Sequence, residues 1–180
     1  MSIFWTMQTD EAWKQYEKQG YLEGTPEHAM YSEEYQWIIK QMKQRLPNYR
    51  GEYPIWLWIK KPDMRSTGHF EGGTKCVRLT LEIDPKNVLV SDFDDWHCVL
   101  NNTFCADKEQ EWEAHYEGNL EITKEESWHR IFDIDRHRDP EWHGEGKRRL
   151  QGTTGRMELS CVKKVEHFIA RKSFVESMFK

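Results

Sequence analysis

Two acidic stretches of the sequence contain the residue types that metal sites and acid–base catalysis use. The first, Ser-Asp-Phe-Asp-Asp-Trp-His at 91–97, places three carboxylates and an imidazole close together. Such groups can bind a divalent cation or transfer protons. A serine or aspartate ahead of a helix is also a common N-cap, because its side chain accepts hydrogen bonds from the first free N–H groups. Asp92 is therefore either a helix cap or a candidate catalytic residue.

The second stretch mixes acids, histidines and arginines. Its potential metal ligands are Asp133, Asp135, His137, Asp139 and His143. Their alternating spacing is typical of a loop that presents ligands to a cation. Arg136 and Arg138 lie between the acids and would cancel much of the field that a dication needs. We therefore expect a solvated loop and no bound metal.

A long loop supplies a third group. Residues 60–74 contain Pro62 and glycines at 68, 72 and 73, so the pattern predicts a loop. Long ordered loops often carry function. Arg65, Ser66 and His69 provide donors that can hold a phosphate or carboxylate. They are also ordinary loop residues, and both interpretations are open.

Two glutamines occupy predicted strands where an apolar or β-branched side chain is easier to place. Gln8 and Gln151 are thus either solvent-facing or directed into a pocket. Aromatic residues near them could stack on a nicotinamide ring or a base, or could form the core. These aromatic residues are Trp5, Tyr53, Trp56 and Trp58.

The pattern of apolar residues predicts the elements that would position these groups. Strands are expected at 3–8, 53–59, 76–83, 88–90, 149–153, 156–162 and 165–170, and the strand at 76–83 is expected to bury one face. Helices are expected after Thr9, from Ser32 to Leu46, after Asp92, and over 107–116. The order favours a compact α+β domain over residues 1–180, with two small, mostly antiparallel sheets flanked by helices.

Composition and charge restrict the function classes. No apolar run approaches the roughly 20 residues of a membrane span, and the four cysteines form no Cys-x-x-Cys pair. We expect a cytoplasmic protein with reduced thiols. The formal net charge is −5, but residues 107–126 are acidic and residues 147–172 are basic. The basic segment is either a solvated face or a surface for nucleic acid.

Several stretches resemble an uncharacterised bacterial family known as domain of unknown function 3841. They are Phe-Trp-Thr-Met-Gln-Thr at 4–9, Tyr-Pro-Ile-Trp-Leu-Trp at 53–58, Val-Leu-Val-Ser-Asp-Phe-Asp-Asp-Trp-His-Cys-Val-Leu-Asn-Asn at 88–102, Glu-Ser-Trp-His-Arg-Ile-Phe-Asp at 126–133, Leu-Gln at 150–151 and Val-Glu-His-Phe-Ile-Ala-Arg at 165–171. The resemblance covers nearly the whole chain and implies no activity.

The layout is also similar to that of ADP-ribosyltransferase-like folds, which bind NAD in a cleft between two small sheets. That resemblance implies that Thr6 or Gln8 holds the nicotinamide ribose and that Tyr53 or a neighbouring tryptophan stacks on the ring. It implies that Gln151 steadies the oxocarbenium-like centre. The chain departs from the pattern, because the first strand has no His or Arg and the usual carboxylate is missing unless Glu158 serves.

These observations predict an NAD- or nucleotide-binding protein of bacterial or phage origin that transfers ADP-ribose to a nucleic acid or protein. The predicted catalytic residues are Gln151, Arg65 and Asp92. The predicted cofactor-binding residues are Thr6, Gln8, Tyr53, Trp56, Ser66 and His69. One alternative is a non-catalytic module that binds protein or nucleic acid through residues 147–172. Another is a metal-dependent hydrolase that uses Asp92, Asp94, His97 or the loop at 133–143.

Overall fold

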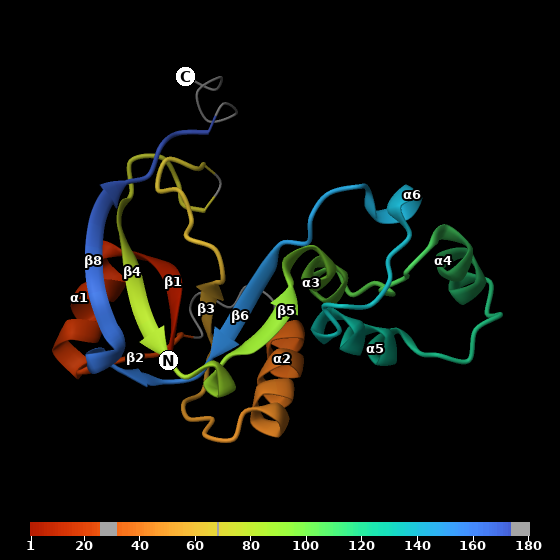
Figure 1. Cartoon of the computed structure of the whole chain (residues 1–180), viewed down its shortest axis with the longest axis horizontal. Coiled ribbons are helices and arrows are strands. Elements are labelled where there is room, and N and C mark those ends of the chain that lie inside the picture. The colour runs from red at the N-terminus through yellow and green to blue at the C-terminus, as the bar shows by residue number, and fades with distance from the viewer. Residues whose placement is uncertain (26–31, 68, 174–180) are drawn as a thin grey trace.

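A computed structural model of the chain describes residues 1–25, 32–67 and 69–173 and has an α+β fold (Figure 1). The strands are β1 (Ser2–Thr9), β2 (Tyr21–Leu22), β3 (Ile55–Trp58), β4 (Lys75–Ile83), β5 (Leu89–Asp92), β6 (Leu150–Thr154), β7 (Met157–Glu158) and β8 (Val162–Ile169). The α-helices are α1 (Asp10–Gln19), α2 (Ser32–Arg45), α3 (Phe93–Leu100), α4 (Glu109–Tyr116), α5 (Lys124–Ser127) and α6 (Pro140–His143). Short 3-10 helices in the described residues are η2 (Pro85–Asn87), η3 (Trp128–Phe132) and η4 (Leu159–Cys161). Gly68 of the predicted loop lies outside the described residues.

The main sheet consists of two three-stranded halves. Its strand order is β5-β6-β3-β1-β4-β8, and each of these neighbours pairs antiparallel. The central strands β1 and β3 share the single register pair Trp5–Trp58, whereas β1 pairs with β4 along its whole length. A second, two-stranded sheet joins β2 to β7. The predicted α+β class with antiparallel sheets is therefore confirmed.

Local sequence signals account for the helix ends. The Thr9 hydroxyl accepts a hydrogen bond from the Ala12 N–H at 3.1 Å, and α1 ends at Gly20 with φ of 85°. That left-handed conformation favours glycine, which has no Cβ to clash. Asp92 caps α3, and Thr123 forms a capping box with Glu126 at the start of α5.

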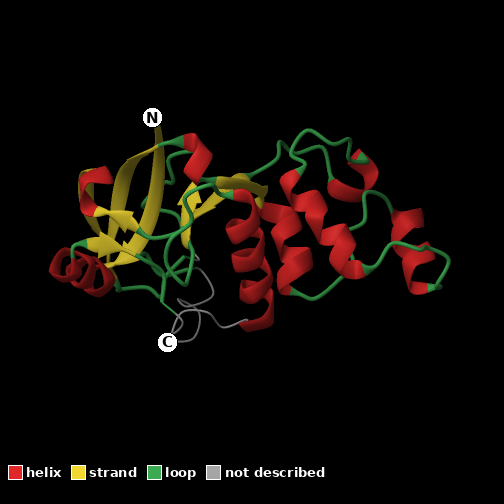
Figure 2. Cartoon of the chain, turned by 90° about the horizontal axis from the view of Figure 1, so that it is seen from below, coloured by secondary structure: helices red, strands yellow, loops and turns green. Residues whose placement is uncertain are grey.

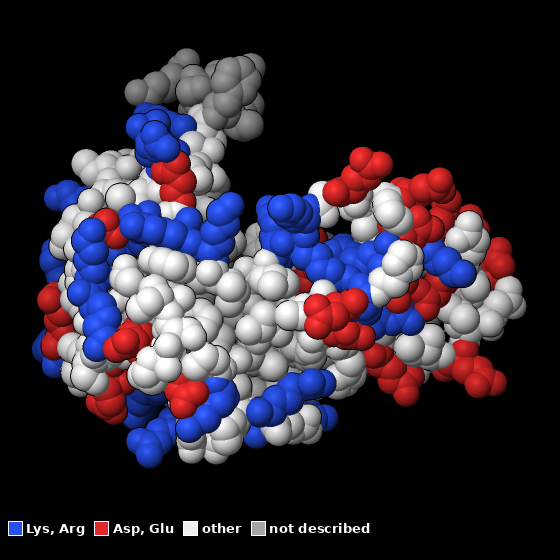
Figure 3. Space-filling view, viewed as in Figure 1, with Lys and Arg blue, Asp and Glu red and all other residues white. Residues whose placement is uncertain are grey.

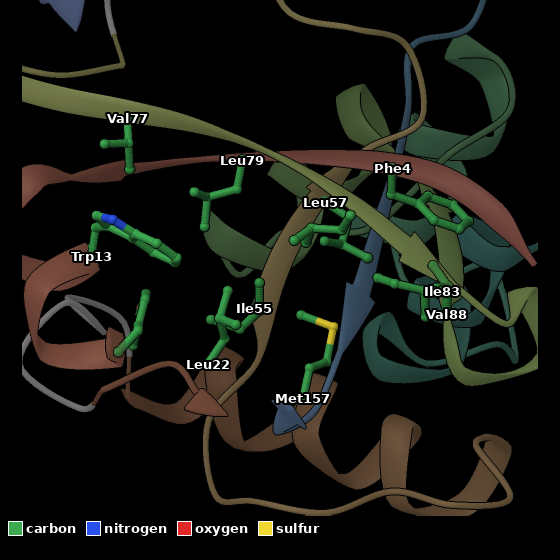
Figure 4. Close-up of a cluster of buried hydrophobic side chains, with 12 residues drawn as sticks. Phe4, Trp13, Leu22, Ile55, Leu57, Val77, Leu79, Ile83, Val88 and Met157 are labelled. Atoms are coloured by element: carbon green, nitrogen blue, oxygen red, sulfur yellow. The ribbon is translucent and has the colours of Figure 1, made fainter. Parts of the chain in front are cut away.

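Two hydrophobic cores hold the fold together. The first lies between the β1, β3 and β4 face of the sheet, α1 and the β2–β7 ribbon (Figure 4). The second lies among α2, α3 and η3 at the helical end (Figure 2). As predicted from its apolar stripe, α2 buries Ile38, Ile39 and Met42 completely or nearly so. Within the described residues, no helix is long and apolar enough to cross a membrane.

The predicted burial of β4 was wrong. The pattern of residues 76–83 predicts one buried face, but Cys76 and Arg78 on the other face are buried as well. The loop after β3 covers this second face, and the Pro62 carbonyl accepts a hydrogen bond from Arg78 at 2.6 Å. Arg78 also pairs with Glu166 of β8 at 2.9 Å. A buried charge needs such partners, so an arginine can occupy a strand between two covered faces.

The Glu166 carboxylate stabilises this arrangement in a pH-dependent way. Hydrogen bonds from Lys164 and Arg78 lower the pKa of Glu166 from 4.5 to about 2. A lowered carboxyl pKa contributes stability above the ordinary pKa, and that stability is lost as the pH falls toward the folded-state value.

We predict that Glu166→Gln lowers the free energy of unfolding near neutral pH by about 1.5–3 kcal/mol, the range for hydrogen bonds to charged groups. The difference from the unsubstituted protein should shrink between pH 4.5 and 2, as measured by urea unfolding. Glu82→Gln is the control, because Glu82 makes a half-exposed pair with Lys163 at 3.0 Å. Equal losses of stability in the two variants would contradict the prediction.

Candidate functional site

A small cavity opens where the two halves of the main sheet diverge. Past the Trp5–Trp58 pair, β1 and the segment leading into β3 separate and leave a cavity of about 190 Å³. Thr6 and Gln8 line it from β1. Tyr53 and Trp56 line it from the opposite side. The structure therefore brings together four of the six residues that the sequence predicts as cofactor-binding.

The backbone around this cavity is tightly constrained. Gly24 forms an isolated antiparallel bridge with Tyr53, and a Cβ at position 24 would collide with the Pro54 carbonyl oxygen. Only glycine allows this close approach of two backbones. The bridge thereby fixes the position of Tyr53 at the edge of the cavity.

The Gln8 amide is held in place by two neighbours. Its Nε2 donates a hydrogen bond to the Thr6 hydroxyl at 2.8 Å, and the Tyr16 hydroxyl donates to its Oε1 at 3.4 Å. Burial raises the pKa of Tyr16 to about 12, so this phenol remains a donor at neutral pH. The Thr25 hydroxyl also lines the cavity and is buried without a hydrogen-bond partner in the part of the chain that the structure describes. A buried hydroxyl without a partner is costly and marks a place where a ligand could bind.

Aromatic side chains connect the small cavity to a second hollow. The Trp58 ring lies 5.6 Å from the Phe93 ring, and the Arg149 guanidinium lies 4.6 Å from the Phe93 centroid. His69 of the long loop contacts Trp58 edge-on, with the ring centroids 5.4 Å apart. A stacking surface with a cation at one end therefore leads away from the small cavity.

The second hollow is larger, at about 1190 Å³, and lies at the helical end of the molecule. Lysine and arginine atoms gather on this face, with acidic atoms around them (Figure 3). The walls come from α3, from Trp112 of α4 and from residues 135–149. Trp112 and Trp142 lie at its rim with their ring centroids 6.4 Å apart.

Three arginines that line the large hollow pair with two buried aspartates beneath it. The Asp92 side chain is fully buried and pairs with Arg138 at 2.9 Å and Arg148 at 3.3 Å. Asp95 pairs with Arg136 at 2.8 Å and with Arg138 at 3.1 Å. The sequence pattern predicted that these arginines lie in a solvated loop, and the structure corrects this: Arg136 and Arg138 are largely buried because they neutralise the carboxylates beneath them.

His143 of α6 completes this network. Arg138 donates a hydrogen bond to His143 Nδ1 at 2.7 Å. Burial, reinforced by the Arg138 guanidinium, lowers the pKa of His143. The imidazole is therefore neutral near pH 7 and acts as an acceptor toward Arg138. Within the described residues, no three His, Cys, Asp or Glu side chains are arranged to hold a metal ion.

The predicted catalytic residues do not meet at one place. Asp92 caps α3, since its Oδ1 accepts hydrogen bonds from the N–H groups of Asp94 and Asp95 at 2.9 and 3.1 Å. Gln151 is buried on β6 and donates to the Ser91 hydroxyl at 3.4 Å. It pairs in register with Trp58 but does not line the small cavity. The capping interpretation of Asp92 is confirmed, whereas its catalytic role stays a prediction.

The predicted phosphate-binding loop is only partly assembled. Arg65 is exposed and binds Asp63 through both its backbone and its guanidinium, with the shortest side-chain distance at 2.7 Å. Hydrogen bonds from Arg65 lower the pKa of Asp63. Ser66 is exposed and donates its N–H to the Asp63 carbonyl at 3.0 Å. Of the three predicted residues, His69 is the one that contacts the aromatic surface, through Trp58.

The basic segment 147–172 forms two separate surfaces. Lys147 and Arg149 lie at the large hollow, just before β6. Lys163 and Arg171 lie on β8 and just after it, at the far edge of the main sheet (Figure 1). The positive charge of this segment is therefore not gathered on one binding face.

The structure is that of an α+β protein with a divided antiparallel sheet. A family model described as Domain of unknown function (DUF3841) matches residues 3–124, about two thirds of the chain, and the chain belongs to this family. The predicted family resemblance is thereby confirmed. No curated protein matches the chain. No solved structure matches it either, so the similarity to ADP-ribosyltransferase folds stays a prediction.

We predict that Asp92→Ala lowers the free energy of unfolding by about 3–5 kcal/mol, because it leaves buried arginines without a counter-charge and removes the cap of α3. Asp94→Ala is the matched control two residues away, since Asp94 is 39% exposed and pairs with the exposed Arg149. Its effect should stay below about 1 kcal/mol. Chemical unfolding curves give both values, and a small effect of Asp92→Ala would contradict a structural role for the ion network.

Proposed function

We propose that the protein binds a nucleotide, with NAD as the leading candidate, and that the ring of the ligand enters the small cavity between β1 and β3. The observation that carries this proposal is the convergence of Thr6, Gln8, Tyr53 and Trp56 on that cavity. The Thr25 hydroxyl is buried at this cavity without a partner in the described part of the chain, and a bound ring with an amide group would provide one.

The size of the cavity fits one part of such a ligand. A volume of about 190 Å³ is smaller than the roughly 300–1,000 Å³ of a pocket for a whole drug-sized molecule. The cavity therefore accepts one ring system, and the rest of the nucleotide extends over Trp58 and Phe93. Arg149 and His69 flank this surface and are the groups that would contact its phosphates.

The finer proposal is transfer of ADP-ribose. In that reaction the bond between the ribose and nicotinamide breaks, nicotinamide leaves with the electron pair, and an acceptor nucleophile bonds to the ribose carbon. Gln151 is the candidate for steadying the charge that develops, because it lies in register beside Trp58. Arg65 and Asp92 are engaged elsewhere, so nucleotide binding has the stronger support of the two proposals.

We predict that Gln8→Leu weakens NAD binding at least tenfold in titration calorimetry, because it removes the amide that the cavity presents. Gln15→Leu, on the exposed side of α1, should bind as the unsubstituted protein does. NAD at 100 times its dissociation constant should raise the free energy of unfolding by about 2.7 kcal/mol.

Absence of any thermal shift with NAD, NADP or mononucleotides would overturn the binding proposal. Release of free nicotinamide is measured separately. Binding without release would reject ADP-ribose transfer and leave nucleotide binding in place.

A second candidate function is binding of single-stranded nucleic acid at the large hollow. The specific observation is that Trp112 and Trp142 are 41% and 38% exposed at the rim, near Lys147, which is exposed, and Arg149, whose side chain is 62% exposed. Aromatic platforms beside cations are the features by which proteins bind single strands. Acidic residues of α4 flank Trp112, so the phosphates would follow the 147–149 side.

We predict that Trp142→Ala and Lys147→Glu each weaken binding of an oligothymidylate in fluorescence anisotropy. Lys147→Glu should also reduce the log–log slope of affinity against salt concentration by about 0.7 for each phosphate that Lys147 neutralises. Arg171→Glu is the matched control, because it makes the same change of charge in the same basic segment but beyond β8. An equal effect of Arg171→Glu, or no binding at low salt, would reject this candidate.

A further inference from the structure

The end of α3 turns the chain back on itself and places two cysteines side by side. Asn102 adopts a left-handed conformation with φ of 54°, and the Thr103 N–H donates to the Cys98 carbonyl at 2.8 Å. This pattern is typical of a Schellman-type helix end. Cys105 belongs to the second hydrophobic core, Cys98 packs against that core, and the two thiols are close enough to influence each other's pKa.

The two thiols have different surroundings. Cys98 is half-buried and lines the large hollow, so small molecules can reach it. Cys105 is fully buried. Its N–H donates to the Ser127 hydroxyl at 2.9 Å, and its carbonyl accepts from Arg130 at 2.8 Å. The buried partner is therefore held rigidly against the accessible one.

A cation lies beside the pair. Arg136 approaches the Cys105 sulfur at 3.9 Å while it pairs with Asp95. The neighbouring Cys105 thiol, assisted by Arg136 and opposed by burial and Asp95, lowers the pKa of Cys98. The Cys98 thiol, together with burial, raises the pKa of Cys105. A reagent can reach Cys98 from the large hollow but cannot reach the fully buried Cys105, so the geometry favours Cys98 as the thiol that reacts first.

We propose that Cys98 is a peroxide-reactive thiol that forms an intramolecular disulfide with Cys105. This proposal is independent of nucleotide binding. The Cys98 thiolate attacks one oxygen of a hydroperoxide, the O–O bond breaks, and the departing oxygen takes a proton. Cys98 becomes a sulfenic acid. The Cys105 sulfur then attacks the Cys98 sulfur and expels its oxygen as water, with the Cys105 proton.

The reaction balances in atoms and in electrons. With hydrogen peroxide, two thiols and one peroxide give one disulfide and two molecules of water. The sulfur atoms lose two electrons, which the peroxide gains. Only the peroxide comes from outside the protein.

The other two cysteines serve as internal controls. Cys76 is buried, and burial raises the pKa of its thiol. Burial likewise raises the pKa of Cys161, to about 11. Neither has the low-pKa environment that activates a thiol toward peroxides.

The test treats the folded full-length chain with limiting hydrogen peroxide and maps the products by mass spectrometry without reduction. We expect a Cys98–Cys105 cross-link that is two hydrogen atoms lighter than the dithiol and forms at least tenfold faster than any oxidation of Cys161. Cys105→Ser should accumulate a sulfenic acid at Cys98 that dimedone traps, and Cys98→Ser should not give the cross-link. Cys161→Ser should leave the cross-link unchanged.

The mapping of the unsubstituted protein decides the outcome even where a cysteine variant fails to fold. Oxidation first at Cys76 or Cys161 would overturn the proposal. A Cys98–Cys105 cross-link that forms only after the protein is unfolded would overturn it too, because the folded turn and Arg136 would then contribute nothing.

Discussion

The burial of two aspartate carboxylates is the constraint on which the helical end of the molecule depends. Asp92 and Asp95 leave water almost completely, at 0% and 2% side-chain exposure, and a carboxylate in that environment requires opposite charge and hydrogen bonds. The required charge comes from arginines 136, 138 and 148, which hold residues 135–149 over α3. Because Asp92 also caps α3, one side chain joins the end of β5, the start of a helix and a distant loop. The large hollow exists because this loop is pinned by its arginines and does not collapse onto the helix.

A different constraint produces the small cavity. Adjacent strands of a sheet normally stay paired, since an unpaired backbone group that is buried costs free energy. Here β1 takes its pairing from β4 over its full length and meets β3 only at Trp5 and Trp58. The β3 strand in turn is paired with β6 throughout. Because β1 is fully paired with β4 and β3 is fully paired with β6, the two halves of the sheet can separate from each other. The polar side chains of Thr6 and Gln8 are tolerated on β1 because they face the resulting gap.

The sequence predicted the structure well where the signal is local. The caps at Thr9 and Asp92 and the apolar stripe of α2 depend on residues within one or two turns, and the structure confirms them. The convergence of Gln8 with Tyr53 and Trp56 was also predictable, because a polar side chain on an otherwise apolar strand needs a polar or open environment. The double burial of β4 was not, since the loop that precedes β4 directly carries no periodic pattern to show that it folds back over the strand. The pairing of Arg138 with Asp92 joins residues 46 apart, and no local pattern marks it. The Arg65–Asp63 pair is local and could have been recognised as an alternative to phosphate binding.

The first turn of α3 links the two hollows physically. Its Phe93 ring contacts Trp58 at the small cavity and the Arg149 guanidinium at the large hollow. The Phe93 N–H also donates to the Arg149 carbonyl at 2.7 Å, and Asp94 pairs with the Arg149 side chain. Cys98 lies on the same helix and lines the large hollow. A packed interior transmits displacement because it has few voids. A displacement of the Trp58 side chain would therefore be felt by Phe93, and through it by Arg149. The family match at residues 3–124 includes Trp58, Phe93 and Cys98 but ends before the arginines. The aromatic residues of this connection, Trp58 and Phe93, thus lie within the part of the chain that the family model matches, whereas Arg149 lies beyond it.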